Sequence, residues 1–81
     1  MRIDPDVLRN LERIPKGDAR RVLLAIKALP ANPYCGDIQK MKGQENTWRR
    51  RVGSYRFFYK LIPNGRIILV FHLERRTSTT Y

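Results

Sequence analysis

Four arginines lie close together in the segment 48–59, whose residue types are typical of a β-hairpin. Successive side chains of a strand point to opposite faces of the sheet. Arg49 and Arg51 therefore share one face, Arg56 on the next strand can join them, and Arg50 falls on the other face. A guanidinium keeps its charge and binds two phosphate oxygens at once. The pattern is compatible with a phosphate-binding site and also with a solvated basic strand surface.

The basic half of the chain is poor in carboxylates. Residues 38–81 contain ten Lys or Arg against only Glu45 and Glu74, a net charge of +8, whereas residues 1–37 contain seven against five, a net charge of +2. Magnesium-dependent nucleases need several carboxylates, so we predict no metal site of that kind. One cysteine, Cys35, and one histidine exclude a disulfide framework and a zinc ligand set.

Phosphoryl chemistry without a metal remains possible. An RNA strand carries its own nucleophile, the 2′-hydroxyl, and arginines held in place can stabilise the charge that develops on the phosphate. The groups available for proton transfer are Tyr81, His72, Glu74 and Lys40 or Lys42. For His72, in an apolar strand, we favour a structural histidine with satisfied hydrogen bonds, and for Glu74 an ion pair with a neighbouring arginine. Phe58 falls on the same face as Arg56, where it is either a sign of a misread register or an aromatic platform for a base.

Length and charge bound the kind of protein. With 81 residues the chain forms a single domain, 1–81, and we expect any site to lie on an open surface rather than in a deep cavity. The net charge of +10 predicts a polyanionic partner, nucleic acid first and an acidic protein second. The sequence shows no signal peptide or membrane-length apolar run, which favours the cytoplasm. We predict no cofactor.

Two helices are expected in the first part of the chain. Asp4 followed by Pro5 is a typical helix start, and the helix should end by Pro15. Asp18 is expected to cap a second helix. Each helix has an apolar stripe that we assign to the core. The stripes are Val7, Leu8, Leu11 and Ile14, then Val22, Leu23, Ile26 and Leu29.

Three strands are expected over residues 47–52, 55–62 and 67–73, with turns at Gly53-Ser54 and Asn64-Gly65. Residues 1–3 could add a short strand, clipped at its start, and residues 38–43 give no clear pattern. The sequence thus predicts an α+β domain in which an N-terminal helical hairpin packs on one face of a small antiparallel β-sheet. The arginines would occupy the uncovered face.

The order and spacing of several segments resemble the RelE/ParE family of type II toxins over nearly the whole chain. The segments are Ile26–Leu29 with Asn32-Pro33, Lys40–Gly43, Trp48–Tyr59, and Glu74–Arg76 with Tyr81. The resemblance implies the RelE-like α+β fold and a toxin neutralised by a cognate acidic antitoxin. RelE-like members are metal-independent endoribonucleases that cleave mRNA at the ribosome, where the basic face would also contact rRNA. ParE-like members instead inhibit DNA gyrase, and an inactive relative that only binds RNA or antitoxin is a third reading.

The resemblance also implies roles for individual residues of a RelE-like member. Arg49 and Arg51 match the strand bases, and Arg56 would hold the scissile phosphate. The late arginine that stabilises the transition state is Arg75, or Arg76 if the alignment shifts by one. The terminal tyrosine that handles protons is Tyr81, and further RNA contacts fall to Lys40, Lys42, Arg76 and Phe58.

The chain departs from the family pattern at three places. Arg49 and Arg51 stand where some relatives have lysines, and a guanidinium is a poor general base, which shifts that role to Tyr81 or to electrostatics alone. Arg50 stands at a position that is usually apolar, and we expect it at the periphery of the sheet with its charge in water. The first strand begins at Met1 and is short.

Overall fold

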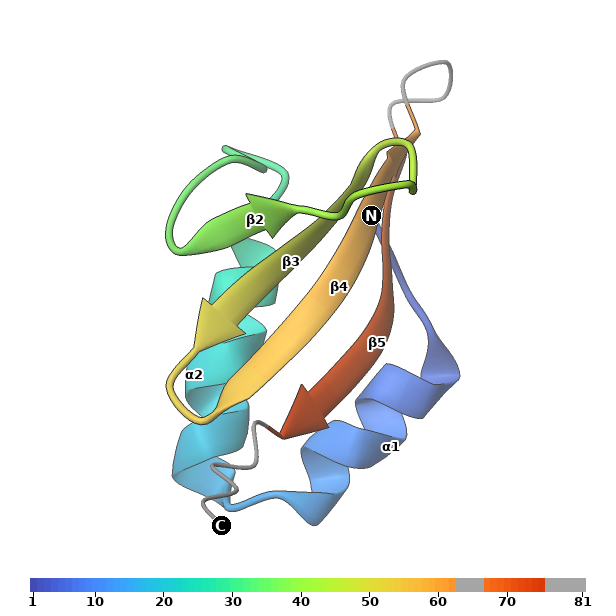
Figure 1. Cartoon of the computed structure of the whole chain (residues 1–81). Coiled ribbons are helices and arrows are strands. Elements are labelled where there is room, and N and C mark those ends of the chain that lie inside the picture. Colours follow the sequence, from blue (N-terminus) through green and yellow to red (C-terminus); the bar gives the residue numbers. More distant parts are fainter. Residues whose placement is uncertain (63–66, 76–81) are drawn as a thin grey trace, which may run out of the picture.

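The described part of the chain forms two helices and a five-stranded sheet (Figure 1). The computed structural model describes residues 1–62 and 67–75. The elements are β1 (Arg2–Ile3), α1 (Pro5–Arg13), α2 (Lys16–Lys27), β2 (Ile38–Lys40), β3 (Thr47–Val52), β4 (Tyr55–Ile62) and β5 (Ile67–Arg75).

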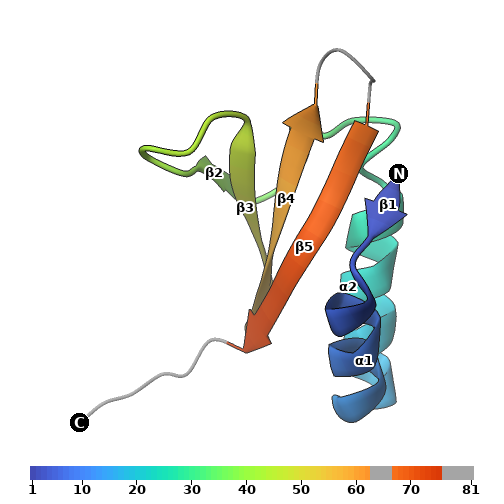
Figure 2. The same ribbon diagram turned by 90° about the vertical axis from the view of Figure 1, so that its right-hand side faces the viewer.

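The strands lie in the order β1-β5-β4-β3-β2, and all neighbours are antiparallel except β1, which runs parallel to β5. Both helices lie on the same side of the sheet, and the segment between β2 and β3 extends from the other side (Figure 2). The predicted α+β fold, with a helical hairpin on one face of a small sheet, is therefore confirmed. One face of the sheet is left without helices.

The start of α1 is as predicted, and the start of α2 is not. The Asp4 side chain accepts a hydrogen bond from the backbone N–H of Asp6 at 2.9 Å, and Pro5 occupies the first turn. The second helix begins at Lys16 after Pro15, so Asp18 lies within its first turn and is not the cap. Its carboxylate instead pairs with Arg21 one turn later.

The core lies between the helices and the two long strands. Its ten buried apolar residues are Val7, Val22, Ala25, Ile26, Leu29, Tyr55, Phe57, Tyr59, Val70 and Leu73. Most positions of the two predicted stripes are buried or half-buried, but Leu8 leaves 46% of its surface exposed. Side-chain alternation along β4 accounts for the strand contribution, because Tyr55, Phe57 and Tyr59 all point towards the helices.

The strand boundaries follow the prediction closely where the sequence pattern is long. β3 and β4 have the expected limits, β1 forms as the expected short strand, and β5 continues two residues beyond Leu73. Strand β2 was not predicted, because three residues at a sheet edge carry too little pattern. Gly53 has φ +57° at the turn between β3 and β4, as the Gly53-Ser54 pair suggests, whereas Asn64-Gly65 lies outside the described residues.

Candidate phosphate-binding face

The helix-free side of the sheet carries the predicted arginines. In the β3–β4 register Arg51 lies opposite Arg56 and Arg49 opposite Phe58, and in the β4–β5 register Arg56 lies opposite Glu74. Side chains that lie opposite each other point to the same face. We call this surface the open face, and its residues are Arg49, Arg51, Arg56, Phe58, His72 and Glu74.

Arg56 is the centre of a short polar chain on the open face. Its Nε donates to Oε2 of Glu74 at 2.5 Å, and the other carboxylate oxygen, Oε1, lies 2.9 Å from Nε2 of His72. The side chains of Arg56 and Glu74 are each 33% exposed, so the pair is accessible to a ligand. The Nε bond leaves the donors of the two terminal guanidinium nitrogens of Arg56 for a phosphate.

The environment of Glu74 keeps its carboxylate ionised. Partial burial acts to raise the pKa of Glu74, but the hydrogen bonds from Arg56 and His72 outweigh it and hold that pKa below its usual value. The expected ion pair between Glu74 and an arginine is therefore present. At neutral pH an ionised carboxylate therefore lies beside the arginines, with one oxygen bonded to Arg56 and the other next to His72.

Arg49 and Arg51 are oriented by groups at the sheet edge. Arg49 donates to the side-chain oxygen of Gln39, which lies opposite it on β2. Arg51 lies 3.8 Å from the carboxylate of Asp37, an exposed pair that contributes little to stability. Both guanidinium groups can leave these weak partners for a phosphate.

Arg50 lies on the opposite face from Arg49 and Arg51, as alternation predicts, and it has a structural role. Its Nη1 donates to the backbone carbonyl of Cys35 at 3.0 Å, and its guanidinium lies against Gly36. Arg50 is half-buried and its bond to Cys35 is exposed, as expected for a residue at the periphery of the sheet, although its Nε atom is buried. Arg50 thus fixes the segment that leads into β2.

Phe58 lies on the open face because the predicted register is correct. Its ring centroid is 5.4 Å from that of His72 and 6.3 Å from that of Phe71. A β-bulge shifts the register between Phe58 and Tyr59, which leaves Phe71 beside His72 without a partner of its own on β4. His72 was expected to be a structural residue of an apolar strand, but its side chain is 51% exposed on the open face.

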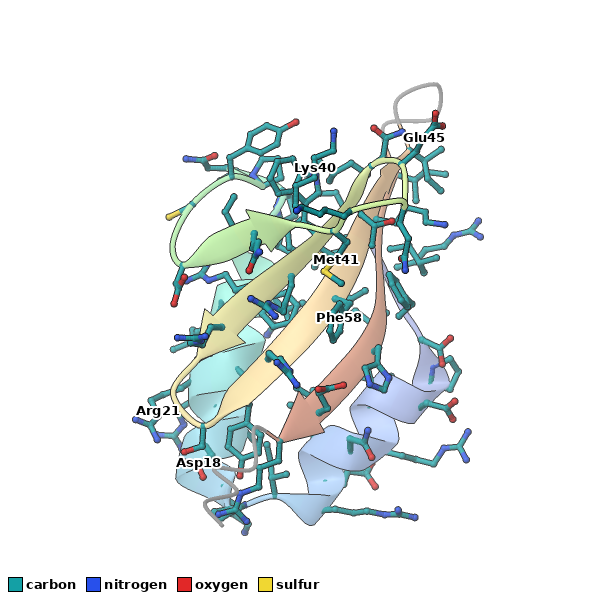
Figure 3. All side chains as sticks on the ribbon, in the orientation of Figure 1. Asp18, Arg21, Lys40, Met41, Glu45 and Phe58 are labelled. Carbon is teal, nitrogen blue, oxygen red and sulfur yellow. The ribbon has the colours of Figure 1, made fainter. Side chains whose placement is uncertain are left out.

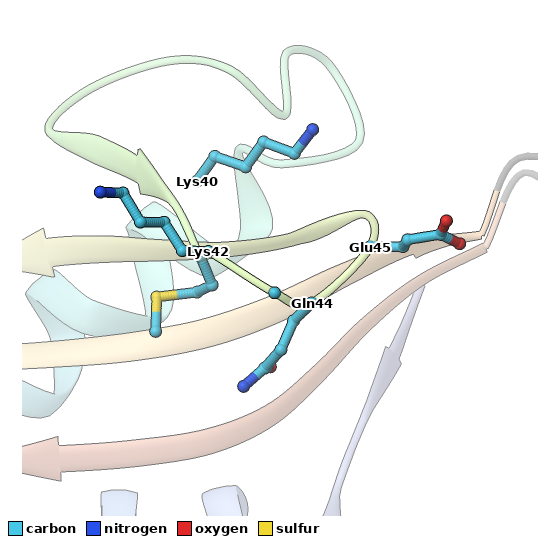
Figure 4. Close-up of a pocket in the computed structure, with 6 residues that line it drawn as sticks. Lys40, Lys42, Gln44 and Glu45 are labelled. Carbon is cyan, nitrogen blue, oxygen red and sulfur yellow. The ribbon is translucent and has the colours of Figure 1, made fainter.

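The two lysines with predicted RNA contacts lie in different places, and Lys40 is not part of the open face. Lys40 lies opposite Trp48 in the β2–β3 register, which places it on the face of Trp48 and away from Arg49. Lys42 belongs to the segment between β2 and β3, where residues 40–45 surround a hollow of about 520 Å³ (Figure 4). In this view Lys42 and Gln44 leave the segment in different directions.

Arg75 lies on the helix side of the sheet, because it pairs with the buried Tyr55 across the ladder. The hydrogen bond from Arg21 lowers the pKa of Asp18, and partial desolvation opposes it. The hydrogen bond from the Tyr55 hydroxyl and the positive charge of Arg75 lower this pKa further. Alternation alone could have indicated this, since Glu74 and Arg75 are neighbours. Arg76 and Tyr81 lie outside the described residues.

Within residues 1–62 and 67–75, no three or more His, Cys, Asp and Glu side chains are grouped so that they could hold a metal ion. Neither helix described here has the length and apolar character needed to cross a membrane.

Comparison with known proteins identifies the family. The model of the ParE toxin of the type II toxin-antitoxin system parDE matches residues 1–78. A relative provisionally named toxin RelE1, from Methanocaldococcus jannaschii, is 30% identical over 73 residues, which cover 86% of this chain and 81% of the relative. The chain belongs to the RelE/ParE toxin family. It is thus a toxin of a type II toxin-antitoxin system.

Solved structures of RelE proteins share this fold. The archaeal RelE-RelB complex from Pyrococcus horikoshii OT3 matches with a TM-score of 0.78 and 26% identity over 96% of this chain and 94% of the matched chain. The RelB-RelE complex from Methanococcus jannaschii gives 0.77 and 24% over 94% and 91%. The isolated E. coli RelE toxin gives 0.80 at 12% identity over 96% and 84%, a likeness of fold alone. Two of these RelE/ParE toxins were solved with an antitoxin bound.

Proposed function

We propose that this toxin is a RelE-like, metal-independent endoribonuclease that cleaves mRNA at the ribosome. The observation that carries the proposal is the placement of Arg49, Arg51 and Arg56 together on the open face. Three guanidinium groups in this arrangement suit a phosphate that gains negative charge during reaction. The same basic surface would contact rRNA, and this target would make the cytoplasm the site of action.

The reaction begins with attack of a ribose 2′-oxygen on the adjacent phosphorus. A bond forms between O2′ and phosphorus, the bond from phosphorus to the 5′-oxygen breaks, and the proton of the 2′-hydroxyl is lost while the leaving oxygen gains one. Arg56 would hold the scissile phosphate, with Arg49 and Arg51 stabilising the charge on its oxygens. The cations supply the electrostatic stabilisation that a metal supplies in other nucleases.

Proton transfer is assigned to Glu74 and His72 among the described residues. Guanidinium groups are poor bases, whereas Glu74 is ionised and lies directly beside Arg56. His72, at 2.9 Å from the other oxygen of Glu74, can pass a proton onward. Tyr81 keeps the role that the family resemblance gives it. Of the two late arginines we propose Arg76, because Arg75 lies on the helix side.

Replacement of Arg56 by alanine tests the proposal. Purified protein added to a translating extract should cleave mRNA, and Arg56→Ala should lower the rate by about 100-fold or more, since loss of one such donor typically costs that much. The measurement is primer extension on a defined mRNA. Thermal unfolding of the variant verifies that the fold persists.

Arg20→Ala is the matched control, because it removes the same charge from the exposed surface of α2. It should cleave like the unmodified protein. If Arg56→Ala cleaved equally well, or if the folded toxin left mRNA intact in an active extract, the nuclease proposal would be wrong. Arg75→Ala and Arg76→Ala in the same assay separate the two late arginines.

Inhibition of DNA gyrase is the second candidate function, because the matching family model describes a ParE toxin. A protein that binds gyrase without chemistry has no need of Arg49, Arg51 and Arg56 beside an ionised Glu74. A supercoiling assay at the concentration that arrests growth distinguishes the two. Loss of supercoiling without mRNA cleavage would favour gyrase.

A cognate antitoxin is the proposed partner. It is supported by the RelE-RelB complexes that share this fold. The charge of +10 favours an acidic protein.

A further inference from the structure

A small hollow lies on the open face next to the proposed phosphate site. Its volume is about 180 Å³. Its lining residues are Met41, Gln44, Phe58, Phe71, His72 and Glu74. The functions proposed above use the edge formed by His72 and Glu74, and the family resemblance gives Phe58 an RNA contact. Met41, Gln44 and Phe71 are left without a role.

Two irregularities of the backbone create this hollow. The β-bulge opposite Phe58 leaves Phe71 without a partner on β4, and the ring centroids of Phe71 and His72 lie 6.3 and 5.4 Å from that of Phe58. Positive φ angles at Gly43 and Asn46 turn the segment between β2 and β3 back over the sheet. Met41 consequently lies next to Phe58, as Figure 3 shows, and Gln44 completes the rim.

The chemistry of the lining suits a flat heterocycle. Aromatic rings and a thioether offer apolar contact to the face of a base, and the Gln44 amide presents one donor group and one acceptor to its edge. The volume is below the roughly 300 Å³ at which pockets for drug-sized ligands begin. One planar ring system is therefore a better match than a larger ligand.

The adjoining charges favour RNA over a peptide side chain as the occupant. Arg56 is bonded to Glu74 at the edge of the hollow, so a phosphate held by Arg56 would place its own nucleoside within reach. We propose that this hollow binds the nucleobase next to the scissile phosphate. The inference rests on the proposed function, since it assigns a substrate contact to the same face.

Binding of mononucleotides tests the base site without requiring cleavage. The four nucleoside 5′-monophosphates and ribose 5-phosphate are titrated into the isotope-labelled full chain, and amide shifts are followed by NMR. The nucleotides should bind more tightly than ribose 5-phosphate and shift the amides of Gln44, Phe58 and Phe71. Phe71→Leu should weaken nucleotide binding by about fivefold or more, because base stacking is lost.

Tyr34→Leu is the matched control, because it removes an exposed ring that packs on Trp48, outside the hollow. Binding should not change in this variant. Gln44→Glu keeps the size of the side chain but replaces its donor group with an acceptor, so it should alter the ranking of the four bases. Its added negative charge should weaken all five phosphate ligands, ribose 5-phosphate included, by a similar factor.

The outcomes separate this inference from the proposed function. Equal binding of nucleotides and ribose 5-phosphate, both lost in Arg56→Ala, would refute the base site and keep the phosphate site. Base-dependent binding by a protein that fails to cleave mRNA in the extract would refute the nuclease and keep the base site. If none of the ligands bound, or if an antitoxin peptide alone shifted the Phe71 amide, the base site would be wrong.

Discussion

The role of each arginine in the hairpin depends on the face it occupies. Arg49 and Arg51 reach the open face, while Arg50 between them turns inward to the carbonyl of Cys35. Alternation along the sequence predicts these faces. It does not predict the partners, because Cys35 and Glu74 are 15 and 18 residues from the arginines they bind. His72 was named among the groups available for proton transfer but was favoured as a structural residue, whereas alternation from Glu74 places it on the open face.

The pH dependence of stability should reveal the ion pair at the start of α2. The pKa of Asp18 is lowered by the hydrogen bond from Arg21, which outweighs the effect of desolvation. A carboxyl whose pKa is lower in the folded state stabilises the fold at any pH above its unfolded pKa, which is near 3.8. This contribution disappears as the pH falls through the folded-state pKa. The melting temperature should therefore fall in acid.

Asp18→Asn keeps an acceptor for the Tyr55 hydroxyl and removes the charge, so its melting temperature should depend less on pH below about 5. Melting curves between pH 3 and 7 measure the effect. Asp6→Asn, in the exposed pair with Arg9, is the comparison. An acid-induced loss in Asp18→Asn as large as in the unmodified protein would contradict the assignment.

At the scale of elements, the long sequence patterns predicted most of the fold, and of the two short strands only β1 was expected. The helices, β3, β4 and most of β5 have enough residues for their periodicity to be read. Strand β2 has three residues and exists because β3 offers it an edge. The cap assigned to Asp18 failed because Pro15, three residues earlier, already starts the helix. The open face was predictable, and the hollow on it was not.

The connection between α2 and β2 is held by the contact of Arg50 with Gly36. Gly36 has φ +87°, and a Cβ there would lie 2.4 Å from Cζ of Arg50. Gly36→Ala should lower the free energy of unfolding by about 2–3 kcal/mol, from the left-handed backbone and from the displaced hydrogen bond to Cys35. Chemical denaturation measures this loss.

Gly43→Ala is a direct control, because its φ is +76° and no atom lies within 4 Å of the added Cβ. It should cost only the backbone part, about 1–2 kcal/mol. In an Arg50→Met background the two glycine substitutions should become similar in cost. A cost for Gly36→Ala that does not depend on Arg50 would show that the contact is unimportant.

At the scale of the whole molecule, the two sides of the sheet divide the work. The helices and the inner side of β4 and β5 form the core, and the outer side of the sheet carries charged residues. The whole chain of 81 residues has a net charge of +10. Composition alone predicted a polyanionic partner. It does not distinguish RNA from an acidic antitoxin, since both are attracted by the same field.

A cognate antitoxin should stabilise the toxin by mass action. At a free concentration 100 times the dissociation constant, binding adds about 2.7 kcal/mol to the free energy of unfolding, and this raises the melting temperature of a domain of this size by about 10–20 °C. Scanning calorimetry of the co-purified complex against free toxin measures the shift. An unrelated acidic protein of equal charge is the control, and an equal shift with that protein would contradict specific recognition.

Strand β5 sits between β1 and β4, yet the ribosome synthesises it after every other described element. Until β5 emerges, the nascent chain lacks Val70 and Leu73 in its core and His72 and Glu74 on its surface, and no strand joins β1 to the sheet of β4, β3 and β2. We therefore expect a growing chain to be inactive until β5 has been made. A premature stop codon anywhere before β5 should abolish toxicity, however little of the protein it removes.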